Sequence, residues 1–216
     1  MIKFENVTAT YKQNVGIFNI SFEVKSGDMI FIMGPTGAGK STVLKTIYKD
    51  MLIDSGKIIL DNEDITTVNS NIHTSNLRKN IGMIFQDFKL LEDRTIFENI
   101  ALPLRIDGYS KKDIVELVKE ALHQINLPGC ESSYPLQLSG GEQQRVCIAR
   151  ALVKKPKIIL ADEPTGNLDP NISDDILDLL EICTGSGSTV LMSTHNFLLI
   201  KPRNKKFIEL DQGRMI

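Results

Sequence analysis

The sequence predicts an α/β fold in which a mainly parallel sheet carries helices on both faces. Residues 29–33 form an unbroken apolar run of strand length, followed by glycines and then a helical pattern, which is the order of an α/β unit. Two more short apolar runs, 158–161 and 189–193, alternate with helical patterns at 140–154 and 172–182. Strands that alternate with helices in this way are typical of a parallel sheet buried on both sides.

The composition is that of an ordinary globular domain, with 42% hydrophobic and 24% charged residues among 216. The 25 basic and 27 acidic side chains leave a net charge of −2, which disfavours non-specific binding to nucleic acids. No apolar run approaches the roughly 20 residues of a membrane span, and residues 1–11 lack the apolar core of a signal peptide, so we expect a cytoplasmic chain. The three cysteines form no CxxC pair and are expected to be reduced packing residues.

The first third of the chain predicts strands and one helix. Residues 2–7 and 17–24 alternate apolar and polar side chains, as half-buried strands do, and residues 25–28 form a turn before the buried strand. Beyond the glycines, residues 40–51 have apolar side chains at helical spacing. This segment therefore predicts a strand, a glycine loop and a helix in succession.

The middle of the chain is predicted to be mostly helical. Residues 61–76 read as a polar connection that leads to a strand at 81–85. From there to about residue 130 the pattern is helical, most clearly at 111–126, where the apolar residues form one stripe. We expect residues 87–155 to form a helical subdomain inserted between two strands of one core. A Gly/Ser turn is expected at 184–188.

A glycine-rich segment between the buried strand and the helix satisfies the pattern G-x-x-x-x-G-K-[ST]. Its glycines let successive backbone N–H groups converge on phosphate oxygens, while the helix N-terminus adds partial positive charge. Lys40 is expected to reach the β and γ phosphates, and the Ser41 hydroxyl to ligate Mg²⁺. A plain turn that begins a helix is the alternative, and the position between strand and helix argues against it. The predicted phosphate-binding residues are Gly34, Pro35, Thr36, Gly37, Ala38, Gly39, Lys40, Ser41 and Thr42.

Two adjacent acids, Asp162 and Glu163, end the apolar run that begins at residue 158. Successive strand residues point to opposite faces, so the two carboxylates are expected to act differently. One can hold Mg²⁺ through its water shell, while the other orients or deprotonates an attacking water. Acids after a strand are more often a solvated turn, but the phosphate loop reverses that preference.

A helix is predicted to begin after Ser139, because Ser139 and Glu142 have the spacing of a capping box. Many ordinary helices begin in this way. Gly140 and Gly141 between them are unusual, since glycine costs about 1 kcal/mol in a helix. They indicate that something approaches bare backbone N–H groups here, and a phosphate fits that demand.

Six motifs occur in one order along the chain. They are residues 34–42, Gln86 within 84–87, the LSGGE sequence at 138–142, residues 158–163, the GNLD sequence at 166–169 and His195 within 193–195. In type and order they resemble the ATP-binding cassette (ABC) ATPases, over essentially the whole chain. The resemblance implies a P-loop NTPase domain with a RecA-like core (1–86 and 156–216), an N-terminal antiparallel β region and the inserted helical subdomain. ATP and Mg²⁺ are the implied cofactors.

The resemblance also implies a head-to-tail homodimer with two ATP molecules sandwiched at the interface. In such a dimer Ser139, Gly140 and Gly141 of one protomer would cap the γ-phosphate bound by the other. This arrangement would explain the two glycines at the start of the helix.

Single residues also match positions of the family. Tyr11 resembles the aromatic residue that stacks on adenine, although a surface tyrosine at the end of a strand is an ordinary alternative. Gln86 resembles the residue that contacts Mg²⁺ and senses the γ-phosphate, and Glu163 resembles the catalytic glutamate. His195 resembles the switch histidine at the γ-phosphate, and Asp169 would belong to the loop that bridges the two sites.

Within the family, residues 77–100 resemble the bacterial cell-division branch. The stretch 161–170 is shared with lipoprotein-releasing and MacB-type exporters, which therefore remain the alternative. The cell-division branch implies a four-helix integral membrane partner and control of peptidoglycan hydrolysis, with no nucleic acid bound and with membrane association only through the partner. Phe88, Leu90 and Leu91 are expected either to grip a cytoplasmic helix of that partner or to belong to the subdomain core.

Other classes of protein fit the sequence less well. A chromosome-structuring ATPase would need a long coiled coil, and no sustained heptad pattern is present. A translation-associated ATPase would usually carry two cassettes. A kinase shares the phosphate loop but has no need of LSGGE.

Overall fold

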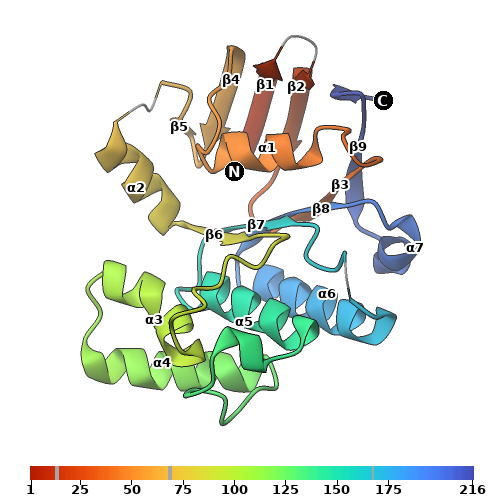
Figure 1. The fold of residues 1–216 in the computed structure, drawn as a ribbon. Coiled ribbons are helices and arrows are strands. Elements are labelled where there is room, and N and C mark those ends of the chain that lie inside the picture. The colour runs from red at the N-terminus through yellow and green to blue at the C-terminus, as the bar shows by residue number, and fades with distance from the viewer. Residues whose placement is uncertain (13–14, 68–69, 167) are drawn as a thin grey trace.

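Two sheets of different kinds organise the computed structural model, which describes residues 1–12, 15–67, 70–166 and 168–216 (Figure 1). The antiparallel sheet has the strand order β2-β1-β4-β5, and the second sheet has the order β10-β9-β3-β8-β7-β6. In the second sheet β9, β3, β8, β7 and β6 run parallel, and only β10 pairs antiparallel. The strands are β1 (Ile2–Lys12), β2 (Val15–Val24), β3 (Met29–Met33), β4 (Ser55–Leu60), β5 (Glu63–Asp64), β6 (Ile81–Ile84), β7 (Ile158–Asp162), β8 (Thr189–Thr194), β9 (Lys206–Asp211) and β10 (Arg214–Met215).

The helices cover both faces of the parallel sheet, as the sequence predicts. They are α1 (Lys40–Ile47), α2 (Asn71–Lys79), α3 (Ile96–Ile106), α4 (Lys111–Gln124), α5 (Gly140–Leu152), α6 (Pro170–Gly185) and α7 (Phe197–Ile200), with short 3₁₀ turns η1 (Pro135–Gln137) and η2 (Lys201–Arg203). Helix α1 lies between the two sheets, whereas α5 and α6 lie on the other face of the parallel sheet (Figure 1). Among the described residues, no helix combines the length and apolar content needed to span a membrane.

Three expectations from the sequence are wrong in detail. The helix that begins at Lys40 ends at Ile47 rather than at residue 51, because Lys49 has a left-handed backbone (φ 58°), and Leu52 is 61% exposed. The polar connection at 61–76 contains β5 and the start of α2, and its residues 68–69 lie outside the described part of the chain. The first two residues of the expected turn at 184–188 belong to the last turn of α6.

Side chains pack into three buried clusters. The first joins the antiparallel sheet to α1 and to one face of the parallel sheet, and the second joins the other face to α5, α6 and α7. The third cluster joins α3, α4 and α5. Helix α5 contributes to two clusters, since Ile148 and Ala151 belong to the second while Val146 and Ala149 belong to the third.

Candidate functional site

The glycine-rich loop at 34–39 joins β3 to α1 and leaves backbone donors free. Gly34 has φ 147°, and a Cβ there would lie 2.1 Å from the Leu210 carbonyl oxygen, so only glycine fits. Gly39 has φ 101° and precedes α1 without a side-chain cap. The first N–H groups of α1 are therefore available to an anion, as a phosphate-binding loop requires.

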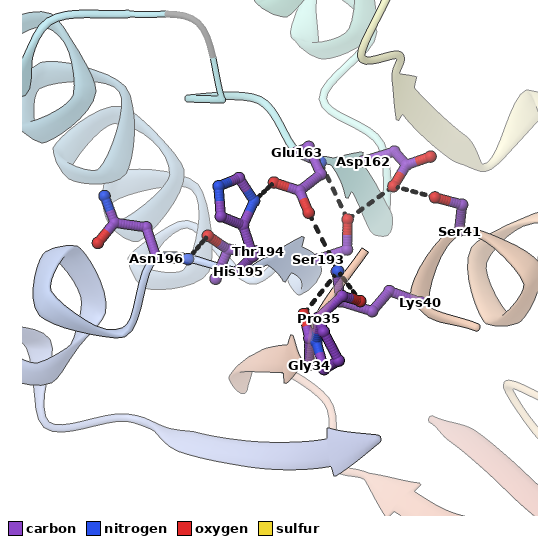
Figure 2. A network of polar contacts seen from close by, with 10 residues as sticks. All are labelled: Gly34, Pro35, Lys40, Ser41, Asp162, Glu163, Ser193, Thr194, His195 and Asn196. Carbon is purple, nitrogen blue, oxygen red and sulfur yellow. Dashed lines mark hydrogen bonds and ion pairs between the residues drawn. The ribbon is translucent and has the colours of Figure 1, made fainter. Parts of the chain in front are cut away.

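Lys40, the first residue of α1, reaches back over this loop. Its Nζ donates to the carbonyl oxygens of Gly34 at 2.8 Å and Pro35 at 3.0 Å (Figure 2). The same Nζ lies 3.2 Å from Oε1 of Glu163, and only 5% of the lysine side chain is exposed. A buried ammonium is costly unless it is paired, so the loop carbonyls and the carboxylate together hold this charge.

Asp162 accepts two hydroxyl hydrogen bonds at the end of β7. Its Oδ1 lies 2.9 Å from the Oγ of Ser41 and 2.7 Å from the Oγ of Ser193 (Figure 2). Ser41 thus points at the carboxylate predicted to share Mg²⁺ with it. Hard oxygen ligands of this kind suit Mg²⁺, so the residues present fit the predicted ion.

The carboxylates of Glu163 and Asp162 have different partners, as expected, but strand alternation is not the cause. It lies one residue beyond β7 in a left-handed conformation (φ 46°), and its N–H donates to the Oγ of Ser193 at 2.9 Å. Its Oε2 lies 2.7 Å from Nδ1 of His195, while Oε1 faces Lys40 (Figure 2). The carboxylate therefore bridges the predicted phosphate-binding lysine and the predicted switch histidine.

Lys40, Ser41, Glu163 and His195 share one pocket of about 280 Å³, whereas Asp162 and Ser193 are not among its lining residues. Its lining residues are Tyr11, Val15, Gly16, Thr36, Gly37, Gly39, Lys40, Ser41, Thr42, Gln86, Glu163 and His195. Tyr11 is 52% exposed at its rim, with Nζ of Lys45 5.8 Å from the ring centroid. An exposed ring beside the phosphate loop can take a flat base, which supports the stacking interpretation.

The LSGGE segment does not line that pocket. Ser139 caps α5, and its Oγ donates to Oε2 of Glu142 at 2.7 Å. Hydrogen bonds from the side chain and backbone of Ser139 lower the pKa of the Glu142 carboxyl. Gly141 has a packing reason of its own, because a Cβ there would lie 3.0 Å from Cδ1 of Ile172, whereas a Cβ at Gly140 would meet nothing within 4 Å. Within one chain, Gly140 is thus exposed, and the space where a side chain would begin is open among the described residues.

Asp169 also lies apart from the pocket. Its side chain caps α6 by accepting from the N–H of Ile172 at 3.1 Å. Asn167 of the GNLD motif lies outside the described residues. Another pocket, of about 400 Å³, has Gly166, Leu168, His195 and Leu198 among its lining residues.

Ser193 is the site residue that sequence reasoning missed. Its hydroxyl donates to Asp162 and accepts from the backbone of Glu163, so it fixes both acids at once. A serine at the carboxyl end of β8 was the available signal, because β8 is paired in parallel with β7 and their ends meet at one edge.

The fold and this pocket define an ATPase with a phosphate-binding loop. The chain belongs to the ABC transporter ATP-binding family, since residues 17–166 match the family described as ABC transporter. It is 46% identical over 216 residues to the cell division ATP-binding protein FtsE of Escherichia coli (strain K12), covering 100% of this chain and 97% of that one. FtsE of Mycobacterium tuberculosis is 39% identical over 218 residues, with 100% and 94% covered.

One of the similar solved structures contains the products of ATP hydrolysis. The chain is similar to the ATP-binding cassette MJ0796, solved as a dimer in a post-hydrolysis state bound to ADP and Pi, with a TM-score of 0.90 and 36% identity over 100% of this chain and 96% of that chain. The chain is therefore an ABC-type ATPase.

Proposed function

We propose that this chain is the ATP-hydrolysing subunit of a bacterial FtsEX-type membrane complex that controls peptidoglycan hydrolysis in cell division. The observation that carries the proposal is the 46% identity to an FtsE protein over the whole chain. Its partner would be an FtsX-like integral membrane protein. The chain itself would lie on the cytoplasmic face of the cell membrane and associate with it only through that partner.

ATP is proposed to close a homodimer around two nucleotides. The open backbone at Gly140 supports this arrangement, because bare N–H groups at the start of α5 suit the γ-phosphate bound by a second protomer. Asp169 would bridge the two sites from the start of α6. The MJ0796 cassette, a relative at 36% identity, is itself dimeric.

The proposed hydrolysis uses residues that already contact one another. Phosphate oxygens would replace the Glu163 carboxylate as the partner of Lys40, which frees Glu163 to accept a proton from the attacking water. His195 would hold the other carboxylate oxygen and contact the γ-phosphate. Ser41, Gln86 and Asp162 would hold Mg²⁺, which when bound neutralises charge on the β and γ phosphates.

The proposed division of the chain places the ATP-binding core at 1–86 and 156–216 and the helical subdomain at about 87–155. A groove of about 400 Å³ lies between them, lined by Phe85 of the core and by Lys89, Pro103, Ile106 and Arg150 of the subdomain. We propose that it receives a cytoplasmic helix of the membrane partner.

Of the three residues expected to grip that helix, none lines the groove. Leu90 packs against the third cluster, as expected for a residue of the subdomain core, which was the alternative interpretation. Leu91 is 41% exposed, and the Phe88 carbonyl is bound by Arg150.

The test is capture of the partner from detergent-solubilised native membranes. Tagged Glu163→Gln chain, which binds ATP but cannot hydrolyse it, is expected to retain an FtsX-like protein with ATP. The matched control, Lys40→Ala, lacks the phosphate-binding charge and should show no effect of ATP. Recovery of a lipoprotein-releasing or MacB-type permease instead would overturn the cell-division role and leave the ATPase site as assigned.

A further inference from the structure

The segment directly after Gln86 has an unusual backbone. Phe88 and Lys89 are both in the left-handed region, with φ 59° and 52°, which side chains with a Cβ rarely adopt. The Lys89 N–H donates to the Asp87 carbonyl at 2.6 Å, and Nζ of Lys89 pairs with the Asp87 carboxylate at 2.8 Å. Such a turn persists only where surrounding groups hold it.

Two side chains of α5 bind this turn. Arg150 donates from Nη1 to the Lys89 carbonyl at 2.6 Å and from Nη2 to the Phe88 carbonyl at 2.8 Å. The Cys147 thiol donates to the same Phe88 carbonyl at 2.9 Å. Burial raises the pKa of Cys147 to about 12, so the thiol keeps its proton and remains a donor.

Gln86 lies between this turn and the core. On its other side Phe85 packs on the core, edge-on to Tyr48 with ring centroids 6.2 Å apart, and Gln86 itself lines the Lys40 pocket. Its position is therefore set by the core through Phe85 and by α5 through Arg150. Helix α5 also begins at Gly140, so one helix carries the LSGGE segment at its start and Arg150 in its last turn.

We propose that Arg150 is a positioning residue for ATP hydrolysis, which holds Gln86 in place by binding the two carbonyl groups of the Phe88–Lys89 turn. The inference rests on the proposed role of Gln86 at the γ-phosphate. Because α5 is one continuous helix from Gly140 to Leu152, the clamp would tie any displacement of the LSGGE segment to a displacement of Gln86. Arginine is required here, since its planar fork serves two acceptors while a lysine is a single point charge.

A double-mutant cycle on the full chain tests the clamp. Arg150→Ala is expected to lower kcat for ATP about tenfold while KM for ATP changes less than about threefold, because the loop that binds the phosphates is untouched. In the Gln86→Ala background the same substitution should cost less than about twofold, since there is no glutamine left to position. Arg105→Ala, an exposed arginine on α3, serves as the matched control and should leave kcat unchanged.

Arg150→Lys is the second variant, used in case Arg150→Ala fails to fold, because lysine keeps the positive charge and a hydrogen-bond donor. It is expected to give an intermediate kcat with wild-type KM. An equal loss for Arg150→Ala in both backgrounds, or wild-type kcat in Arg150→Lys, would overturn the clamp while leaving the ATPase assignment intact. Unchanged kcat in Gln86→Ala alone would remove Gln86 from its proposed role, and the clamp with it.

Discussion

Glu163 and Lys40 form an ion pair in the structure, and a phosphate group of the proposed nucleotide would compete with Glu163 for Lys40. Both side chains are nearly buried, with 10% and 5% exposed. Binding of phosphate must therefore break one buried ion pair to form another. Sequence reasoning placed both residues at the γ-phosphate but could not foresee that they contact each other. The contact depends on the left-handed backbone of Glu163, which turns this residue away from β7.

The pair predicts an effect on affinity as well as on rate. Glu163→Gln removes the competing carboxylate, so ATP is expected to bind about three- to tenfold more tightly, equivalent to roughly 0.6–1.4 kcal/mol, while phosphate release is lost. Titration with a fluorescent ATP analogue and a phosphate-release assay measure the two effects. Asp162→Asn is the comparison, since it leaves the Lys40 pair intact. Weaker binding by Glu163→Gln would contradict the competition.

At the scale of elements, the segment after His195 is tied to α6 by two basic residues, Arg203 and Lys205, of which Arg203 makes most of the contacts. Arg203 of η2 contacts the carboxylates of Asp174, Asp178 and Glu181, and its Nη2 to Asp174 Oδ1 distance is 2.7 Å. These three acids lie on one side of α6. Because α6 begins after Asp169, this contact links the segments that carry His195 and Asp169.

Arg203→Ala is expected to destabilise the fold by about 1 kcal/mol, a modest figure because the carboxylates are largely exposed and screened. This loss of stability should be smaller at 1 M salt, because salt screens the interactions between surface charges. Thermal unfolding at low and high salt measures it. Lys57→Ala, which breaks a single exposed pair with Asp64, should have almost no effect. An equal loss at both salt concentrations would mean that Arg203 acts through packing.

The elements that sequence reasoning found are those with an unbroken apolar run or a clear apolar period. The buried strands β3, β7 and β8 and the stripe of α4 satisfy this condition. Strands β4 and β9 were missed because few of their side chains are buried: Ile58 and Leu60 in β4, and Leu210 in β9. Their position is decided by pairing with β1 and β3, which is a long-range property.

At the scale of the whole molecule, the single chain holds half of each proposed site. The Lys40 pocket and the Gly140 backbone are separate surfaces of one protomer, and only a second protomer could unite them. The motif order predicted this arrangement through family resemblance alone, since no local pattern reports which surfaces meet in a dimer.

Gly140→Leu tests the second surface. A Cβ at residue 140 meets nothing within 4 Å, so the melting temperature is expected to stay within about 3 °C, whereas ATP-dependent dimerisation of a Glu163→Gln chain should be lost. Size-exclusion chromatography with light scattering measures the dimer. Gly185→Leu is the matched control, because Gly185 is also exposed and open at a helix terminus. A dimer that tolerates leucine at both positions would place the interface elsewhere.

The way in which the helical segment joins the sheet has a mechanical consequence. The chain leaves the sheet at the carboxyl end of β6 and returns at the amino end of β7, and these strands are parallel neighbours, with Ile81 opposite Ile158. Because the two strands are parallel, the two attachment points lie at opposite ends of this strand pair. The line that joins them defines an axis about which the helical segment can rotate. Rotation of α3, α4 and α5 about that axis would change the angle at which α5 faces a second protomer, while α1 and β7, which position Lys40 and Glu163, stay still.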